Sequence, residues 1–476
     1  MDSKTKRRRG KAEARPKRPR SESTLQRTTF LTSRQMDFFS EKELVTQTGH
    51  EIEDWPLVFI KEIMDNSLDA CEEADIAPEI KIKADAGGIT VADNGLGLPE
   101  STLKAALDFT IRASNREAYV APDRGAQGNA LKTILPMPRV VDPDHGKLIV
   151  QAHGKRHSIT CGADPISQRA VMHDDATNRR TTGTMIRIEW LPRDDDDGDV
   201  VWPFNDLCPQ WNGYPFEERF QSLIEGFAVF NPHATITLDW FGTDRIWKAT
   251  DPKWEKWKPN KPTSAHWYKL PHLERLIGAY ITHDRDAEMD RLVSDLIGEF
   301  DGLSGSQKRS KVLDDAGLKR VRLSEFVLGD RLDSQRIKRL LESMQKHTRP
   351  IKPKRLGIIG EEHLRQRLLA MGVQPESFRY SIKLSKDGVP WVLESAFGWL
   401  GDESEDARKI FAGANWSAAI NNPFRHFGQT GEGLEAVLSD QRVGSHEPIV
   451  FCLHLADPRV EYTDRGKSAI VIGGAT

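Results

Sequence analysis

The segment around Glu62 combines residue types that could do chemistry together. Glu62, Asn66 and Asp69 stand four and then three positions apart, a spacing that places them on one face of a helix. A glutamate one turn away from an asparagine suits a site in which the carboxylate activates a water and the amide oxygen binds Mg²⁺. Charged helix faces are more often simply solvated, so this segment alone leaves both interpretations open.

A second candidate is the run Val91-Ala92-Asp93-Asn94-Gly95-Leu96-Gly97-Leu98-Pro99, which follows an expected strand. A carboxylate at a strand end can accept a hydrogen bond from an exocyclic amine, as in adenine recognition. Gly95 and Gly97 would let the backbone approach a base without side-chain clash. The alternative is a plain Asp-Asn-Gly turn that leaves a hairpin.

A third candidate is the glycine-containing loop Asp123-Arg124-Gly125-Ala126-Gln127-Gly128-Asn129-Ala130-Leu131-Lys132, which runs into an expected helix. Backbone amides in such a loop and at a helix N-terminus can hold phosphates. The loop lacks the Lys-Thr or Lys-Ser of a Walker A motif and is not Gly-x-Gly-x-x-Gly, so neither the P-loop nor the Rossmann class fits. By itself, the glycine pair is also compatible with an ordinary loop.

The elements that must position these residues follow from local patterns. Apolar residues at helical spacing predict a helix over 56–73, and short strands are expected at 79–85 and 89–92 around a Gly87-Gly88 turn. Further strands are expected at 147–151 and 184–190. The pattern is mostly helical from 273 to 347, and strands and helices mix again after 378.

Length and composition set the protein class. A chain of 476 residues predicts two to four domains. No apolar run is long enough for a membrane helix, the N-terminus lacks the apolar core of a signal peptide, and four dispersed cysteines fit a reducing cytosol. We therefore expect a cytoplasmic, nucleoid-associated protein without a membrane partner, or a nuclear one in a eukaryote.

Charge is distributed unevenly along the chain. Residues 2–20 carry ten Lys or Arg against two acidic residues, although the whole chain has a net charge of −3. We expect residues 1–24 to form a disordered basic tail. Such a tail can bind a polyanion such as DNA or act only as a solubilising segment, and the sequence favours neither.

The order of the three motifs changes their meaning. A Glu-x-x-x-Asn helix, then Asp-Asn-Gly-x-Gly, then Arg-Gly-x-Gln-Gly resembles the Bergerat ATP-binding fold, and Thr182-Gly183-Thr184 before a strand resembles its last box. Within that superfamily the chain resembles the DNA topoisomerase VI B subunit, over roughly residues 30–475. The resemblance also rests on Asn231-Pro232-His233-Ala234, on the helix-two-turn-helix-like stretch around Ala316-Gly317-Leu318, and on the loop Tyr462 to Ile470.

The resemblance implies a role for each matching residue. It implies that Glu62 is the general base, that Asn66 binds Mg²⁺, and that Lys467 is a lysine offered to the ATP γ-phosphate. The residues that it implies for nucleotide binding are Asn66, Asp69, Asp93, Gly95, Gly97, Gly125, Gln127, Gly128 and Thr184, with Gly125, Gln127 and Gly128 in the lid over the phosphates. A lysine ammonium there would neutralise charge that builds up during phosphoryl transfer.

The chain departs from the family pattern in two places. The family lid usually reads Gly-x-x-Gly-x-Gly, but here Asn129-Ala130 stands in place of the last pair, and Ala130 adds a methyl group near the phosphates. The sequence given ends at Thr476, soon after the lysine loop, where the family's transducer continues as a helix that docks on the DNA-cleaving partner protein. We also find no recognisable strand-cleaving centre, so no DNA cleavage is expected from this chain alone.

The expected architecture is a multidomain α+β protein. It comprises a Bergerat-fold α/β sandwich over 25–245, a linker and small helical insert over 246–349, and a transducer domain with a mixed sheet over 350–476. In the segment 247–268, four tryptophans among lysines could clamp nucleic acid, but a loop fixed to the body by buried tryptophans is favoured.

The expected function is an Mg²⁺-dependent ATPase that forms an ATP-gated homodimeric clamp on duplex DNA and acts with a separate DNA-processing partner, such as a topoisomerase VI A-like protein. Two alternatives stay open. One is the B component of a complete type IIB topoisomerase, and the other is a nucleotide-binding regulator that hydrolyses nothing.

Overall fold

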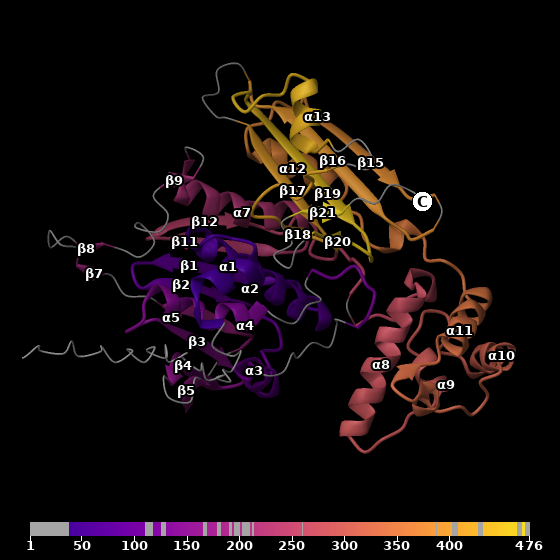
Figure 1. Ribbon diagram of the computed structural model, residues 1–476. Coiled ribbons are helices and arrows are strands. Elements are labelled where there is room, and N and C mark those ends of the chain that lie inside the picture. The colour runs from indigo at the N-terminus through magenta and orange to yellow at the C-terminus, as the bar shows by residue number, and fades with distance from the viewer. Residues whose placement is uncertain are drawn as a thin grey trace, which may run out of the picture. The chain divides into compact units, whose positions relative to one another are not determined.

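A computed structural model of the protein contains two mixed β-sheets and a helical segment (Figure 1). The structure describes residues 38–109, 118–124, 130–164, 169–178, 182–189, 193–194, 200–201, 210–211, 214–258, 260–386, 388–401, 408–426, 432–463 and 469–471. The basic tail of residues 1–24 therefore lies outside the described residues.

The larger sheet has eight strands in the order β12-β11-β1-β2-β6-β3-β4-β5. Its neighbours pair antiparallel except for β1 and β11, which are parallel, so the sheet is mixed. The strands are β1 (Glu79–Asp85), β2 (Gly88–Ala92), β3 (Lys147–Ala152), β4 (Lys155–Asp164), β5 (Arg169–Asn178), β6 (Met185–Glu189), β11 (Thr235–Trp240) and β12 (Thr243–Trp247).

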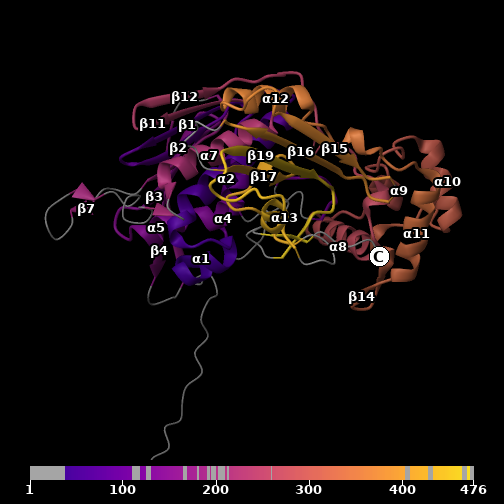
Figure 2. The ribbon, with the colours of Figure 1, turned by 90° about the horizontal axis from the view of Figure 1, so that it is seen from above.

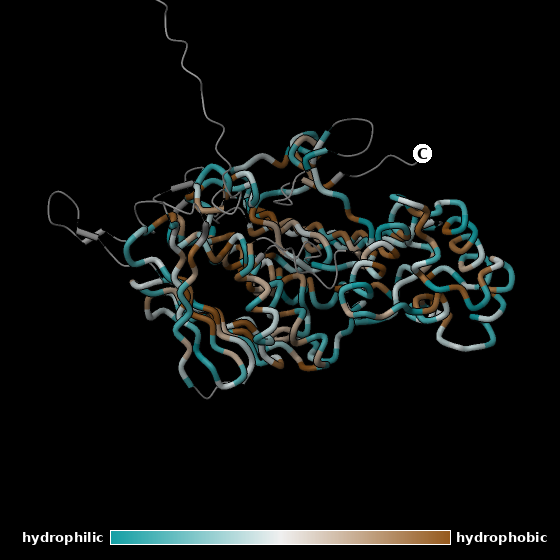
Figure 3. The backbone as a smooth tube through the Cα atoms, turned by 60° about the horizontal axis from the view of Figure 1, so that its bottom comes forward, coloured by the Kyte–Doolittle hydropathy of each residue, from teal (hydrophilic) through white to brown (hydrophobic). Residues whose placement is uncertain are grey.

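One face of this sheet is covered by helices. Along β1, buried residues alternate with exposed ones, as expected for a strand with one face in the core. The long helices α2 (Trp55–Glu73) and α7 (Phe216–Phe230) contact each other, and they contact β2 and β11 respectively. Figure 3 shows hydrophobic (brown) and hydrophilic (teal) stretches following one another closely along the backbone. The result is a two-layer α/β arrangement in which α2 lies directly over the central strands.

The smaller sheet has five strands in the order β15-β16-β19-β17-β18. It is also mixed, because β17 and β19 pair in parallel and the other neighbours are antiparallel. Helix α7 contacts β17 and β18 (Figure 2), and α2 contacts β18. The strands are β15 (Arg379–Leu384), β16 (Val392–Trp399), β17 (Lys409–Ala414), β18 (Ser417–Ala418) and β19 (Ile449–Ala456).

Between the two sheets the chain forms a helical segment. Its helices α10 and α11 pack on each other, and α11 packs on α8. The buried side chains of α11 recur at helical spacing, and this amphipathic pattern favours a helix in that segment. The helices are η3 (Ala265–Trp267), α8 (Leu270–Asp286), α9 (Val293–Ile297), α10 (Ser306–Ala316), η4 (Leu323–Phe326) and α11 (Ser334–His347).

Shorter elements connect these parts. They are α1 (Glu41–Thr48), η2 (Ile52–Asp54), α3 (Glu100–Leu107), α4 (Ala130–Ile134), α5 (Met137–Val141), β7 (Arg193–Asp194), β8 (Val200–Val201), β9 (Gln210–Trp211), β10 (Tyr214–Pro215), β13 (Val327–Leu328), β14 (Arg331–Leu332), η5 (Pro353–Arg355), α12 (Glu361–Ala370), α13 (Leu434–Asp440), β20 (Glu461–Tyr462) and β21 (Ile470–Val471).

The structure confirms the expected α+β class with mixed sheets. Trp257 and Trp267 are fully buried, so the tryptophan-rich loop is fixed to the body, as the sequence favoured. All described elements fall within one compact unit, and the domain boundaries at 245 and 349 remain predictions. No helix in the described ranges is both long and apolar enough to cross a bilayer.

Candidate active site

Helix α2 places three of the candidate residues in different environments. Glu62 is half-buried, Asn66 is exposed and Asp69 is buried. The helix buries its apolar stripe, with Ile63 and Leu68 in the core, so the polar positions turn toward the helix flanks. Glu62 and Asn66, one turn apart, remain accessible to a ligand. Asp69 contradicts the alternative of a merely solvated acidic face, because its side chain is enclosed.

The carboxylate of Asp93 is held in place at the end of β2. Its Oδ1 accepts hydrogen bonds from the backbone N–H groups of Gly95 at 2.9 Å and Thr184 at 3.1 Å. Its Oδ2 accepts from Ser67 Oγ of α2 at 3.1 Å. Burial raises the pKa of this carboxyl, and these three donors oppose the rise. The chain continues from here toward α3, so Asp93 does not belong to a simple hairpin turn.

Two glycines make the backbone approach around Asp93 possible. Gly183 has φ of +74°, and a Cβ there would lie 2.0 Å from the Asp93 carbonyl oxygen. Gly97 has φ of +94°, and a Cβ there would lie 3.2 Å from His153 Nε2. The backbone of Thr184 both donates to the Asp93 side chain and accepts from the Asp93 N–H. Gly183 thus has a steric role that was not assigned from the sequence.

Asp69 is bound by Arg124, the first residue of the Arg-Gly-x-Gln-Gly motif, for which the sequence indicated no role of its own. Arg124 Nη1 lies 2.6 Å from Asp69 Oδ1, and Arg124 also donates to both carboxylate oxygens of Glu72, at 2.7 and 2.6 Å. The guanidinium is completely buried. The available signal was a row of carboxylates at helical spacing, Asp65, Asp69 and Glu72. Such a row needs cationic partners wherever the fold buries it.

The same cluster reaches the smaller sheet. Lys256 Nζ lies 2.8 Å from Glu72 Oε2, and Asn231 Nδ2 donates at 2.9 Å to the Trp416 carbonyl in the β17–β18 turn. Arg124 Nε also points to that carbonyl at 3.4 Å. Arg124 and Lys256 hold the pKa of Glu72 well below its usual range. The cluster therefore joins Arg124, the residue that directly precedes the glycine loop in the sequence, to α2 and to the smaller sheet.

No protein-family model matches the chain. It is 26% identical over 209 residues to the B subunit of type 2 DNA topoisomerase 6 from Methanosarcina acetivorans, covering 40% of this chain and 30% of that protein. It is also 26% identical over 214 residues to the protein of the same name from Methanosarcina mazei, with the same coverage of both. These matches decide the relationship. The chain is a distant relative of the topoisomerase VI B subunit.

The match to the topoisomerase VI B subunit is partial. The chain aligns with about 30% of the length of the two Methanosarcina proteins. The solved ATPase region of Saccharomyces cerevisiae topoisomerase II superposes with a TM-score of 0.37 and 9% identity, over 88% of this chain and 77% of that one. This structural likeness carries no functional argument.

Several candidates suggested by the topoisomerase VI pattern lie outside the described residues. These are Gly125, Gln127 and Gly128 of the lid, together with Asn129 and Lys467. Ala130 is described and begins α4. The strands on either side of the lysine loop are described as well, and Tyr462 of β20 pairs with Ile470 of β21.

The side chains present fit a magnesium ion held mainly by a nucleotide. Among the residues that the structure describes, no group of three or more His, Cys, Asp or Glu could hold a metal ion. Mg²⁺ beside phosphates commonly takes one or two protein oxygens and keeps waters. The exposed amide of Asn66, one turn from Glu62, supplies such an oxygen. In a relative of the topoisomerase VI B subunit, Asn66 is therefore the candidate ligand.

Proposed function

We propose that this chain binds Mg-ATP, hydrolyses it, and uses the cycle to close a homodimeric clamp on duplex DNA. In this proposal, residues 25–245 form the ATP-binding domain, 246–349 the helical insert, and 350–476 the transducer. The protein would act beside the chromosome with a separate DNA-processing partner and would not cut DNA alone.

The observation that carries the nucleotide part is the fixed carboxylate of Asp93. Three donors orient it, and a carboxylate oxygen has lone pairs left for a further donor such as the adenine amine. Beside it, Leu96 is 70% exposed between Gly95 and Gly97. An exposed leucine next to a fixed acceptor provides an apolar surface for a base together with a polar group that orients it.

Hydrolysis is supported by the pairing of Glu62 and Asn66. When bound, Mg²⁺ would offset charge on the phosphates. Glu62 would accept a proton from the attacking water, and Asn66 would orient the ion. The lid residues Gly125, Gln127 and Gly128 and the lysine Lys467 remain part of the proposal on sequence grounds.

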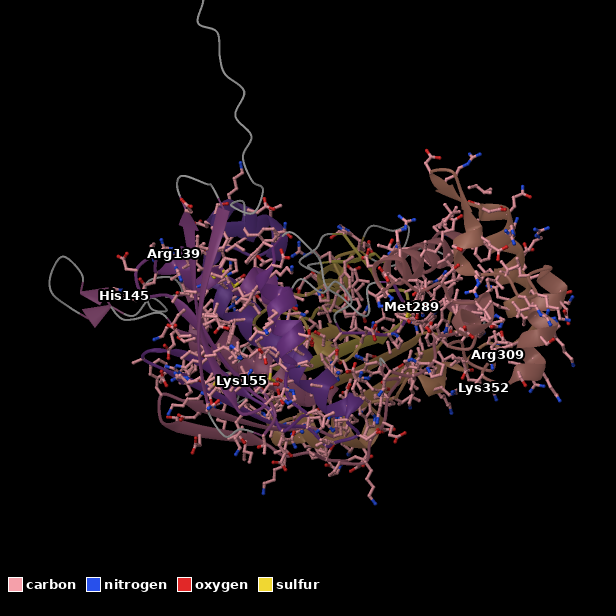
Figure 4. The ribbon with its side chains drawn as sticks, turned by 90° about the horizontal axis from the view of Figure 1, so that it is seen from below. Arg139, His145, Lys155, Met289, Arg309 and Lys352 are labelled. Atoms are coloured by element: carbon pink, nitrogen blue, oxygen red, sulfur yellow. The ribbon has the colours of Figure 1, made fainter. Side chains whose placement is uncertain are left out.

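DNA binding is supported by the charge of a segment that comprises the second half of the helical insert and the first residues of the proposed transducer. Residues 303–355 carry fifteen Lys or Arg and six Asp or Glu, a net charge of +9 in a chain whose net charge is −3. Thirteen of the fifteen basic side chains are exposed. Figure 4 labels Arg309 and Lys352 in this segment. We call residues 303–355 the basic segment, and such a density of exposed cations favours a phosphate backbone.

The name of the Methanosarcina relatives favours one partner class. A topoisomerase VI A-like protein would make this chain the B component of a type IIB topoisomerase. A clamp with another DNA-processing partner uses the same nucleotide site. Copurification with an A-type protein, together with ATP-dependent relaxation of supercoiled DNA, would support the first alternative.

The test measures ATP hydrolysis with and without duplex DNA, while the mass of the protein is followed with a non-hydrolysable ATP analogue. We expect DNA-stimulated turnover and an analogue-dependent dimer. Glu62→Gln should still bind the analogue and dimerise but lose at least about 100-fold in kcat. Analogue binding without turnover by the wild type would instead support the non-hydrolysing regulator. No binding would refute the nucleotide site.

A further inference from the structure

Lys61, the residue before Glu62, is a lysine enclosed in the protein. Its side chain is 9% exposed, and its Nζ lies 3.0 Å from Asp65 Oδ2 and 3.9 Å from Glu62 Oε1. An ammonium group is costly to bury unless it is paired and has a defined geometry. Lys61 is thus fixed at one edge of the half-buried Glu62 carboxylate.

The partner of Lys61 is anchored from the smaller sheet. Ser417 Oγ, on β18, donates to the same Asp65 Oδ2 at 2.8 Å, although the two residues are 352 positions apart. Tyr462 of β20 is half-buried and lies close enough to Lys61, Asp65 and Glu62 to interact with them electrostatically. The surroundings of Glu62 therefore include two segments of the C-terminal part of the chain.

We propose that Lys61 is a positioning residue for Glu62. Asp65 holds the Lys61 ammonium group in place, and Ser417 connects Asp65 to the smaller sheet. The inference rests on the proposed ATPase function. It adds that the base is correctly oriented only while β18 is docked on α2. Movement of the smaller sheet would then change the catalytic carboxylate through a direct chain of contacts.

The physical effect on Glu62 has two parts. An opposite charge within about 4 Å favours the ionised carboxylate, which is the form that a general base needs. A fixed ammonium group also restricts the rotamers of the glutamate, so fewer orientations compete with the productive one.

Two of the described groups near Glu62, Lys61 and Tyr462, keep their charge state over the range of an assay. The carboxylates of Asp65 and Glu62 raise the pKa of Lys61, so its ammonium stays protonated. Burial raises the pKa of Tyr462 to about 12, so its phenol stays neutral. Asp65, the remaining carboxylate of this group, accepts from both Lys61 and Ser417. The acidic limb of the kcat profile should therefore report Glu62.

The experiment compares full-length wild type, Lys61→Arg and the double variant Lys61→Met/Asp65→Asn, which avoids leaving Asp65 as an unpaired buried charge. For each protein, kcat is measured from pH 5 to 9, and affinity for the non-hydrolysable ATP analogue and thermal unfolding are measured in parallel. Ile63→Val serves as a control that loosens the packing of α2 without changing a charge.

In the double variant we expect the acidic limb to move to higher pH, because the ammonium group 3.9 Å from Glu62 is lost. Loss of the Asp65 carboxylate opposes this shift, so it should stay below about one pH unit, and analogue affinity should stay within about twofold. Lys61→Arg and Ile63→Val should keep the wild-type limb. An unchanged limb in a folded double variant would overturn the role of Lys61 while leaving the ATPase proposal intact. If the double variant fails to fold, Ser417→Ala is tested in its place. A shifted acidic limb or an altered kcat in Ser417→Ala would then support the proposal. Wild-type values for both would refute it.

A wild type without turnover would overturn both proposals. A wild type that hydrolyses ATP independently of Glu62 would overturn the assigned base, and with it the role of Lys61. These outcomes separate a failure of the further inference from a failure of the proposed function.

Discussion

At the residue scale, the candidate site depends on one carboxylate with a fixed direction. Asp93 receives two backbone donors and one hydroxyl donor. Each donor constrains the side chain, so a ligand would meet an acceptor that is already oriented. The cost is a buried carboxyl whose pKa is raised by its surroundings.

Replacing Asp93 by Asn tests this acceptor. The amide oxygen can still accept from Gly95 and Thr184, but its nitrogen cannot accept from an adenine amine. We expect ATP affinity to fall at least about tenfold with little loss of stability. Calorimetric titration with ATP measures the change, and Ser67→Ala serves as a control that removes one supporting donor. Unaltered affinity would show that adenine binds elsewhere.

A second prediction at the residue scale concerns Gly183. Gly183→Ala should destabilise the protein, because its φ of +74° is unfavourable for alanine and its Cβ would meet the Asp93 carbonyl. The conformational part alone costs about 1–2 kcal/mol. Gly305, where an added methyl group would have nothing within 4 Å, is the matched control. Equal urea midpoints for Gly183→Ala and Gly305→Ala would contradict this role.

At the element scale, α2 is the support that joins the parts. Glu62 and Asn66 lie on its accessible flank. Ser67, on its buried side, donates to Asp93. Asp69 and Glu72, in its last turns, bind Arg124. Because these residues share one rigid helix, a shift at either end reaches the others. The buried carboxylates in the last turns of α2 are paired with Arg124 and Lys256 from two loops, so the removal of one partner at a time is costly.

At the element scale, a histidine of β19 leads to a prediction for how stability depends on pH. His454 is buried and accepts the Trp416 N–H on Nε2 at 2.9 Å, and burial lowers its pKa to about 3. Burial also lowers the pKa of His363 on α12 to about 4. In the unfolded chain, both histidines bind a proton as the pH falls through about 6.5, whereas in the folded chain they stay neutral. The free energy of unfolding is therefore highest above pH 6.5 and decreases as the pH falls below it.

We therefore expect the free energy of unfolding to fall between pH 7.5 and 5.5, approaching about 1.4 kcal/mol per pH unit for each histidine below its unfolded pKa. Urea unfolding at several pH values measures the slope. His454→Asn should make it flatter. A free energy that is constant over this window would contradict the burial of neutral histidines.

At the scale of the whole molecule, charge is segregated. The basic segment and the basic tail contrast with a chain that is acidic overall. In the basic segment, Arg339 and Lys352 have no ion-pair partner among the described residues, whereas Lys346 is paired with Asp315. Free cations can release counterions from DNA, which makes binding salt-dependent.

Charge reversal tests this surface. Lys338→Glu/Arg339→Glu on α11 should weaken binding to duplex DNA and reduce the slope of log K against log salt by up to about two. Lys42→Glu/Lys81→Glu, with the same change in net charge on exposed residues elsewhere, should have little effect. Fluorescence anisotropy across a salt series measures both. Equal effects would indicate a general dependence on net charge.

The sequence by itself determined the local chemistry. The helix over 56–73, the strands around Gly87-Gly88, and the order of the Glu62, Asp93 and Arg124 motifs follow from short-range periodicity and turn residues. The relationship to the topoisomerase VI B subunit was also predictable, because it depends on motif order and spacing. Burial of the tryptophans followed from their large apolar area.

Only the tertiary structure decided which charges meet. Arg124 joins Asp69 and Glu72 across more than fifty residues, and Ser417 meets Asp65 across 352 positions. No local pattern specifies such pairs, since they depend on how α2, α7 and the smaller sheet pack together. The steric need for Gly183 likewise arises from a contact with Asp93, ninety residues earlier in the chain. Local spacing indicated the reactive groups, and long-range packing fixed their directions and partners.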